Sequence, residues 1–244
     1  MLSLGQVIQG EVGELLRRRL QQEKSLRKFI QSEGLDAFPA VVVDDDWRQG
    51  ISALVQCHGL GALRPNLVLT GWSSDAERQE EFFTLLRTLE GLERSIAILR
   101  LDPTSDRDPW NPPPGPIDVW WRGKENGHLM LLLGHLLQLN EGWRGKRLRL
   151  LRVIASEAGR EDSLAHLRQL LIDARIEADA RIVVDSDPRE AIRKASVRSA
   201  ITFLGFRVPD AGDEDELVVA MGTMMQGMGT VMQIHSAGRV ELEA

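Results

Sequence analysis

Apolar and polar positions follow two rhythms along the chain, short apolar runs and longer segments with helical spacing. The short runs predict strands, in the order PAVVVDDD, NLVLTGW, SIAILRL, IDVWW, RLRLLRVI, ARIVVD, ITFLGF and a run near residues 230–235. Apolar residues three or four apart predict helices that begin at residue 11 and stop at Gly34, that begin at residue 47 and end before Gly59 or Gly61, and that span about residues 73–90, 127–142, 158–174, 188–197 and 213–226. Because strands alternate with long helices, we predict an α/β fold with mostly parallel sheets and helices on both faces.

One segment interrupts this alternation. Residues 102–116, DPTSDRDPWNPPPGP, hold six of the ten prolines. Proline donates no ladder hydrogen bond and favours stiff, extended backbone, so we predict a linker there. The linker divides the chain into a first α/β half at residues 1–101 and a second at residues 117–244. Each half has its own series of strands and helices, although no repeat is visible residue by residue.

Composition narrows the class of protein. A chain of 244 residues with 43% apolar content can bury a sizeable core. The net charge of −6 gives no reason to expect nucleic acid or an anionic membrane as a partner. The longest apolar stretch, residues 129–139, is shorter than the ~20 residues of a membrane-spanning helix. The N-terminus lacks the pattern of a signal peptide. The single cysteine, Cys57, excludes an internal disulfide and fits a reducing compartment.

Two pairs of residues could bear chemistry. Cys57 and His58 could form a nucleophile and base, but neighbours on a helix diverge by about 100°, so we predict an inert, buried cysteine instead. His128 and His135 are seven residues apart and share a helical face, yet no third ligand stands at metal spacing. We therefore predict no metal site.

Two loops follow strands at the end of the sheet where α/β proteins bind ligands. Asp44, Asp45 and Asp46 could bind a cation there, but they precede a predicted helix and are more simply its N-terminal caps. Thr70–Asp75, TGWSSD, could receive a phosphate at a helix N-terminus. This loop lacks both the GxGxxG and the GxxxxGK[ST] patterns, so it is a weak indication.

Two further patterns have alternative interpretations. Gly142–Arg152 carries five basic residues and no acid; Lys146, Arg147 and Arg149 fit an exposed surface or the polar face of an edge strand, or else an anion site. The methionines Met221, Met224, Met225 and Met228 have helical spacing, which suits a core or a contact with another subunit. No catalytic, cofactor-binding or metal-binding residues are assigned.

Adjacent tryptophans end one predicted strand. Trp120 and Trp121 must point to opposite faces of a sheet, because successive side chains alternate along a strand. We predict that each packs under one of the two helix layers, without a ligand.

Four stretches together resemble a known family. They are residues 53–72, ALVQCHGLGALRPNLVLTGW; residues 117–137, IDVWWRGKENGHLMLLLGHLL; RLRLLRVI; and AIRKASVRSAITFLGFRVP. In this order they resemble the cytosolic C-terminal domain of the cation-chloride cotransporters. The pattern GLGxLxPNxVLxGW and the IDVWW strand before a leucine-rich helix are the most specific parts.

The resemblance implies two α/β halves similar to universal stress proteins. It also implies a non-enzymatic, regulatory and dimer-forming tail of a membrane carrier that moves chloride with sodium or potassium. Such a tail lies on the cytoplasmic side of the membrane beneath the transmembrane domain, its other expected partner, and is soluble by itself. The ion sites of the family lie in the transmembrane part, so no residue here is assigned as an ion ligand.

One departure from the family affects the expected ligands. The family's tail opens with a further strand and helix before the segment that matches LGQVIQGEVGELL, so the first half lacks its first unit. That unit would hold part of the pocket in which some tails bind adenine nucleotide. A stress-protein-like nucleotide-binding module is therefore the second hypothesis. A hydrolase or transferase is the third, weakened by the absence of a GxSxG pattern.

Overall fold

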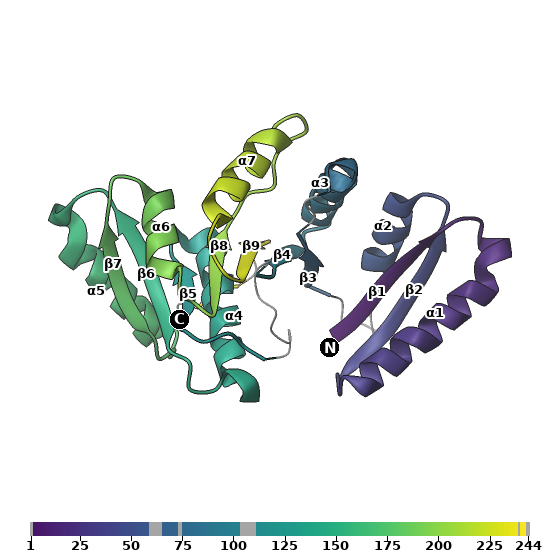
Figure 1. Cartoon of the computed structure of the whole chain (residues 1–244), viewed down its shortest axis with the longest axis horizontal. Helices are drawn as coiled ribbons and strands as arrows, with labels where there is room; N and C mark the ends of the chain where they lie inside the picture. The colour runs from purple at the N-terminus through teal and green to yellow at the C-terminus, as the bar shows by residue number, and fades with distance from the viewer. Residues whose placement is uncertain (1, 59–64, 73–74, 103–110, 239, 243–244) are drawn as a thin grey trace. The chain divides into compact units, whose positions relative to one another are not determined.

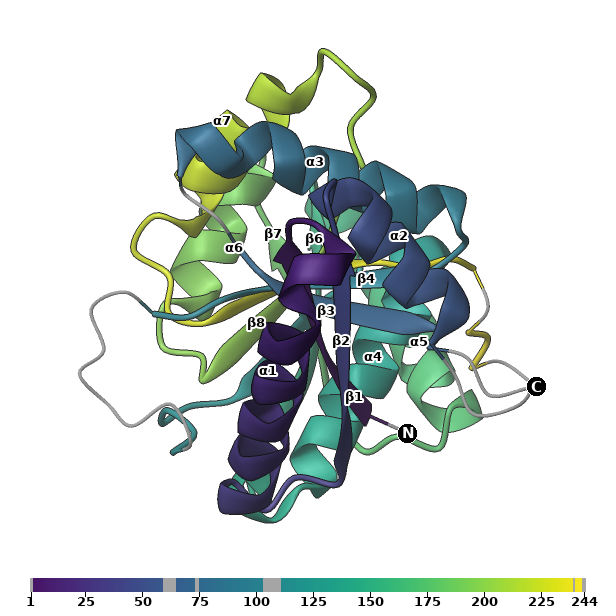
Figure 2. The same ribbon diagram turned by 90° about the vertical axis from the view of Figure 1, so that its right-hand side faces the viewer.

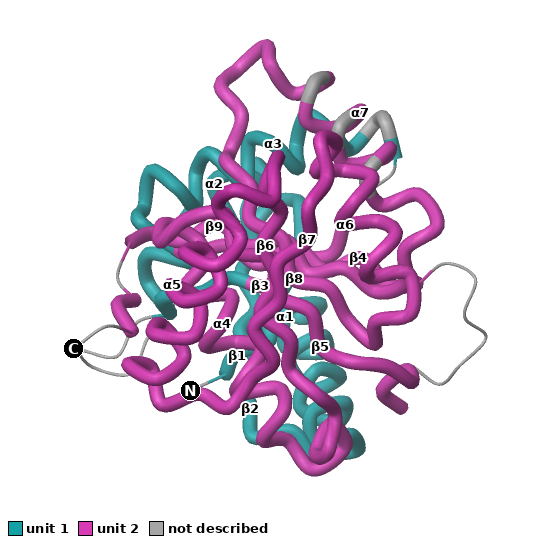
Figure 3. The backbone as a smooth tube through the Cα atoms, turned by 90° about the vertical axis from the view of Figure 1, so that its left-hand side faces the viewer, with its two compact units in different colours: residues 1–68, 73–94 teal, residues 69–72, 95–244 magenta. Residues whose placement is uncertain are grey.

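The computed structural model describes residues 2–58, 65–72, 75–102, 111–238 and 240–242, and it has the predicted α/β organisation (Figure 1). The chain forms two compact units (Figure 3). Unit 1 comprises Met1–Val68 and Ser73–Arg94, and unit 2 comprises Leu69–Trp72 and Ser95–Ala244. Within the described ranges, no helix has the length and apolar content needed to cross a membrane. Residues 103–110 of the predicted linker lie outside the described residues.

Unit 1 is built on a small parallel sheet. Strand β1 (Leu2–Gln9) pairs with β2 (Ala37–Asp44), and helix α1 (Val12–Ser32) connects them. Figure 2 shows α1 running along the strands. Helix α2 (Trp47–Cys57) covers the other face of this sheet (Figure 1), and α3 (Ala76–Gly91) contacts α2. The α1 face buries a cluster of aliphatic side chains, namely Ile8, Val41 and Val43 with Leu15 and Leu26 packed against them.

Glycines bring α2 close to its face of the sheet. A Cβ atom on Gly50 would lie 2.5 Å from Val7 Cγ1, and one on Gly5 would lie 2.6 Å from Leu54 Cδ2. A larger residue at position 50 would meet both Val7 and Asp44, whereas at position 5 the end of the Leu54 side chain would have to move. Helix α2 ends at Cys57, and Gly59 and Gly61, either of which was predicted to stand past its end, lie outside the described residues.

Unit 2 contains a seven-stranded sheet in the order β3-β4-β9-β8-β5-β6-β7. Its strands are β3 (Leu67–Gly71), which begins in unit 1, β4 (Ser95–Arg100), β5 (Ile117–Trp120), β6 (Leu148–Ile154), β7 (Asp179–Val184), β8 (Ile201–Gly205) and β9 (Val231–His235). Strands β5 to β9 pair in parallel with one another, whereas β4 pairs antiparallel with β9. The sheet is therefore mostly parallel, as predicted.

Four helices cover the sheet of unit 2. They are α4 (Lys124–Leu139), α5 (Arg160–Asp173), α6 (Pro188–Ser196) and α7 (Glu214–Met225), with short 3₁₀ turns at Glu141–Trp143 and Glu157–Gly159. Right-handed crossovers place α4 and α5 on one face and α6 and α7 on the other (Figure 1). The order β7-β6-β5-β8-β9 makes this a doubly wound sheet whose chain direction reverses between β5 and β8.

The adjacent tryptophans pack against these two helix layers, one against each. The indole Nε1 of Trp120 donates a hydrogen bond of 2.9 Å to Ser196 Oγ at the end of α6. Trp121 packs on the opposite face, where its ring lies against Gly127 of α4. Both side chains are buried. The prediction of one tryptophan under each helix layer is confirmed.

Candidate functional site

Doubly wound sheets bind ligands in the crevice where the strand order reverses, which in unit 2 lies at the carboxyl ends of β5 and β8. In unit 2 an amide side chain bridges this crevice. Asn126 Nδ2 donates a hydrogen bond of 2.9 Å to the carbonyl oxygen of Phe206, and Asn126 Oδ1 accepts one of 2.8 Å from the backbone N–H of Ser236. Asn126 thus ties together the segments that follow β8 and β9.

Two aromatic side chains pack near the start of α4, the helix that carries Asn126. The ring of Trp121 would lie 2.5 Å from a Cβ atom on Gly127, so helix and ring are in close contact. The His128 ring lies with its centroid 5.5 Å from that of Trp121, and its Nδ1 is 3.3 Å from the carbonyl oxygen of Val240. Trp121 and His128 therefore pack together beneath the first turns of α4.

A buried ionic network lies near the opposite, amino-terminal ends of the strands. Asp118 of β5 is fully buried, and its carboxylate accepts hydrogen bonds of 2.6 Å from both Nε and Nη2 of Arg149 on β6. Ser196 Oγ donates to the same carboxylate at 2.6 Å, and Ser199 Oγ also donates to it. The network joins β5 and β6 to the end of α6, which is a structural role.

The interpretation of the basic stretch as the face of an edge strand is wrong. Strand β6 lies between β5 and β7, and Arg149 points to the buried carboxylate of Asp118. Lys146 is also engaged within the chain, since its Nζ donates to the carbonyl oxygen of Pro113 at 2.5 Å and lies 5.6 Å from the centroid of the Trp143 ring. Burial lowers the pKa of Lys146 from its ordinary value of 10.5.

Cys57 and His58 do not form a catalytic pair. The prediction of a buried cysteine is wrong. Cys57 is exposed, because its side chain points outward from the last turn of α2. His58 is the C-cap residue of α2, and its Nε2 lies 2.5 Å from Ser3 Oγ on β1. The histidine thus links the end of a helix to a strand.

The aspartates at the end of β2 and after it form hydrogen bonds within the protein. The side chain of Asp46 accepts a hydrogen bond of 2.8 Å from the N–H of Arg48 and caps α2, which confirms the capping interpretation. Asp44 Oδ1 accepts from the N–H of Asp46 at 3.0 Å, and the carbonyl oxygen of Asp45 accepts from Gln9 Nε2. In the loop TGWSSD, Ser73 and Ser74 lie outside the described residues.

The remaining candidates have structural positions. His128 and His135 both lie on α4, and no group of three metal-ligating side chains occurs in the part of the chain that the structure describes. Met221, Met225 and Met228 are buried, and Gln233 Nε2 lies 3.7 Å from Met225 Sδ, so these methionines belong to the core. The side chain of Met224 lies outside the described residues.

A polar hollow of about 570 Å³ lies where α6 begins and α7 ends. Arg189 and Arg193 face it together with Asp187 and Glu190. Glu190 pairs with Arg193 at 2.7 Å and with Lys194 at 3.2 Å, and the hydrogen bonds from these two bases lower the pKa of Glu190 below 4.5. Because acids offset the bases, this hollow has no strong preference for an anion.

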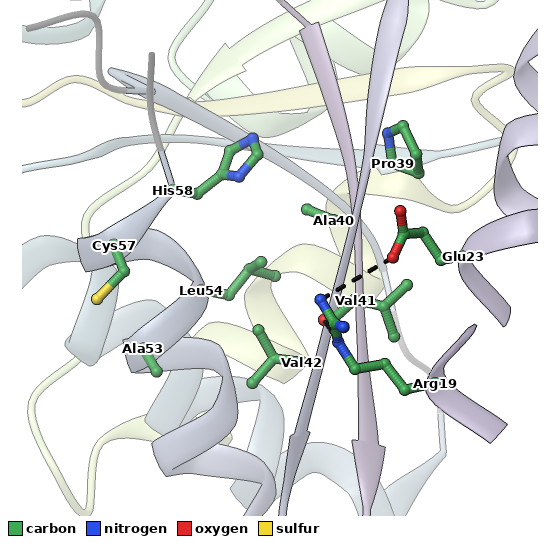
Figure 4. Close-up of a pocket in the computed structure, with 10 residues that line it drawn as sticks. All are labelled: Arg19, Glu23, Pro39, Ala40, Val41, Val42, Ala53, Leu54, Cys57 and His58. Carbon is green, nitrogen blue, oxygen red and sulfur yellow. Dashed lines mark hydrogen bonds and ion pairs between the residues drawn. The ribbon is translucent and has the colours of Figure 1, made fainter. Parts of the chain in front are cut away.

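Unit 1 contains a groove of about 290 Å³ along the outer edge of β2 (Figure 4). Its lining residues are Arg19 and Glu23 of α1, residues 39–42 of β2, and Ala53, Leu54, Cys57 and His58 at the end of α2. Arg19 reaches across to the strand, where its Nε donates a hydrogen bond of 3.0 Å to the carbonyl oxygen of Val41. Sequence reasoning missed this groove because Arg19 and Glu23 look like the ordinary polar side of a helix; Pro39 within a strand was the available signal.

Comparison with known families and structures agrees with this architecture. The family model described as Solute carrier family 12 matches residues 1–107. The cytoplasmic domain of a prokaryotic cation chloride cotransporter has the same fold, with a TM-score of 0.71 at 14% sequence identity, over 97% of this chain and 86% of that chain. The predicted resemblance to the cytosolic domain of the cation-chloride cotransporters is confirmed.

The fold is also that of universal stress proteins. The universal stress protein from Archaeoglobus fulgidus DSM 4304 matches with a TM-score of 0.58 at 12% sequence identity, over 98% of this chain and 87% of that chain. The predicted fold class, an α/β fold of mostly parallel sheets similar to universal stress proteins, is confirmed. At 14% and 12% sequence identity, the two structural comparisons show the shared fold.

Proposed function

We propose that this chain is a non-enzymatic regulatory and dimerisation domain of a cation-chloride cotransporter, on the cytoplasmic side of the membrane. The observation that carries the proposal is the Solute carrier family 12 match over residues 1–107, in a chain whose fold agrees over 97% of its length with a cotransporter's cytoplasmic domain. In this role the domain influences the movement of chloride with sodium or potassium through contacts with a second subunit and with the transmembrane domain.

The hydrogen bonds of Asn126 at the carboxyl ends of the strands of unit 2 support a role in packing rather than in chemistry. A catalytic or nucleotide-binding doubly wound protein keeps the carboxyl ends of its strands open to a ligand. Here Asn126 bridges two of those ends by hydrogen bonds of 2.9 and 2.8 Å, and Trp121 lies buried beside it. A rigid unit of this kind is suited to transmit a change in subunit contacts to an attached domain.

The dimer is the part of the proposal that is simplest to test. We expect light scattering behind size-exclusion chromatography to give twice the chain mass of 27.3 kDa at high micromolar concentration. A monomer under these conditions would contradict the dimerisation role. Regulation requires the parent transporter: variants that dissociate the dimer should change the rate of chloride flux in vesicles, while the amount of transporter in the membrane stays constant.

A second function deserves a direct test because the fold matches that of a universal stress protein. The alternative is a module that binds ATP or ADP. Ligand that binds only the native state raises its apparent stability, so a nucleotide site would give a thermal shift that saturates at micromolar nucleotide. We expect no shift with either nucleotide, and a saturating shift would favour the alternative.

A further inference from the structure

In the part of the chain that the structure describes, no strand pairs with the outer edge of β2 in unit 1, whereas the equivalent strand of unit 2 is paired on both sides. Unit 2 follows the order β5-α4-β6-α5-β7, and β7 pairs with the outer edge of β6. Unit 1 repeats this order as β1-α1-β2-α2, but β3, the next strand in the sequence, pairs in the seven-stranded sheet. Among the described residues β2 therefore pairs with β1 alone, and the position that β7 takes in unit 2 is open.

Two hydrogen bonds establish which backbone groups face this outer edge. The N–H of Gly10 donates to the carbonyl oxygen of Asp44 at 2.9 Å, so Asp44 faces β1. Because successive residues of a strand direct their backbone groups to opposite edges, the groups of Val43, Val41, Pro39 and Ala37 face outward. The bond of 3.0 Å from Arg19 Nε to the carbonyl oxygen of Val41 agrees with this assignment.

We propose that this edge pairs with the same edge of a second copy of the chain, antiparallel and across a twofold axis beside Ala40. The inference rests on the dimer proposed above and names its interface. In this register Ala37 lies opposite Val43 of the partner subunit, and Pro39 lies opposite Val41 of the partner subunit. All four outward-facing residues of each strand are then paired, and the two small sheets become one four-stranded sheet.

The proline explains why this register is preferred. The N–H of Val41 donates to the carbonyl oxygen of the partner's Pro39, but proline cannot return a hydrogen bond. The carbonyl oxygen of Val41 is therefore left without a donor from the ladder, and it is this oxygen that Arg19 already bonds at 3.0 Å. In each copy the arginine supplies the hydrogen bond that the opposite proline lacks.

Neighbouring registers leave carbonyl groups without donors. An axis at Pro39 would place the two prolines opposite each other, so that neither carbonyl receives a ladder hydrogen bond. An axis at Val41 would place Pro39 opposite the partner's Val43 and leave the Val43 carbonyl without a donor. The register centred on Ala40 avoids both defects, and its short central side chain allows the close approach of two strands at a twofold axis.

Helix α1 carries a surface that suits a second copy. Leu16, Leu20 and Glu23 share one side of the helix, since they are spaced by four and three residues. The two leucines are 51% and 53% exposed. A twofold axis perpendicular to the sheet would place the second α1 antiparallel beside the first, covering these leucines. The same operation brings Glu23 of one copy toward the partner's Arg19, so the charges are complementary.

Disulfide cross-linking tests the register directly. In an antiparallel pair without mutual hydrogen bonds the Cα atoms lie ~4.5 Å apart, which is within the range of a disulfide. The variant Ala40→Cys should therefore form a covalent dimer under mild oxidation. Cys57 lines the same groove and must first be changed to serine, so that no disulfide forms within one chain.

Val42→Cys in the same Cys57→Ser background is the matched control. Val42 lies on the same face of β2 as Ala40, but in the proposed register it is opposite the partner's Phe38. Along the strand, two copies of residue 42 are then about 14 Å apart, four residues at ~3.4 Å each, so no disulfide is expected. If the protein is a dimer by light scattering but Ala40→Cys forms no more disulfide than Val42→Cys, the edge pairing is wrong and the dimer uses another surface. A monomer would contradict both the interface and the dimer.

Ala37→Pro provides an independent test that needs no oxidation. The N–H of Ala37 faces outward, so its loss leaves the ladder to β1 intact, and proline is tolerated at the first residue of a strand. The dimer would lose two symmetric hydrogen bonds, which should raise its dissociation constant about tenfold in sedimentation equilibrium. An unchanged dissociation constant, with native circular dichroism, would refute the pairing.

Discussion

The buried pair of Asp118 and Arg149 allows a quantitative test of what stabilises unit 2. The change Arg149→Met removes the partner of a carboxylate that is fully buried, while the partly buried space along β6 stays filled. The two hydrogen bonds of 2.6 Å from the guanidinium disappear, and Asp118 keeps only the hydroxyl groups of Ser196 and Ser199. Burying a carboxylate without a cation is costly, because hydroxyl donors do not replace the lost charge.

The expected loss is large compared with the stability of a domain. Removing one partner of a buried ion pair costs about 3–5 kcal/mol, whereas folded domains are stable by about 5–15 kcal/mol. For a unit of this size we expect the melting temperature to fall by roughly 6–20 °C, at about 2–4 °C per kcal/mol. Asp118→Asn in the Arg149→Met background should recover part of this loss, since a neutral amide is less costly to bury than an unpaired carboxylate.

Urea unfolding followed by tryptophan fluorescence measures these changes, because Trp120 and Trp121 lie in the same unit. Arg181→Met is the control: Arg181 pairs with Asp179 at 3.3 Å, but the two side chains are 46% and 48% exposed. Exposed pairs contribute about 0–1 kcal/mol, so this variant should unfold at nearly the parent midpoint. If Arg149→Met cost no more than Arg181→Met, the argument that this network stabilises unit 2 would be refuted.

Two further predictions concern packing and titration. Gly127→Ala should destabilise the protein by about 1–3 kcal/mol because its Cβ atom would lie 2.5 Å from the Trp121 ring. Gly222→Ala, with no atom within 4 Å, should stabilise α7 by about 0.5–1 kcal/mol, and equal effects in thermal melts would contradict the close contact. The carboxyl group of Glu190 should titrate below pH 4.5 in NMR, since Arg193 and Lys194 lower its pKa. Its contribution to stability is therefore present above that pH and is lost as the pH falls through the lowered pKa; a midpoint at or above 4.5 would contradict the pairing.

Local patterns predicted most helices and strands, because apolar periodicity is a local property of the sequence. Strand β1 was missed, since LSLGQVIQ mixes glycine and polar residues with only a few aliphatic ones. Its strand conformation depends on pairing with β2. Each residue of β1 pairs with the residue 35 positions later in the sequence. A contact of that kind leaves little signal in the segment itself.

The side-chain partners were harder to predict than the elements. Asp118 and Arg149 are separated by 31 residues and meet only because β5 and β6 are neighbours in the sheet. Without the strand order, the alternation of Arg147 and Arg149 with leucines suited an edge strand equally well. The exposure of Cys57 likewise depends on where α2 ends relative to the groove, which apolar spacing does not determine.

The position of β9 has a consequence for synthesis of the protein. This last strand, Val231–His235, lies between β4 and β8, with which it forms antiparallel and parallel ladders respectively. Until the ribosome has synthesised β9, no strand connects β4 to the parallel strands β5 to β8. The sheet can close only when Val231–His235 has left the exit tunnel, so nascent chains should acquire protease resistance in this region abruptly, once that strand has emerged.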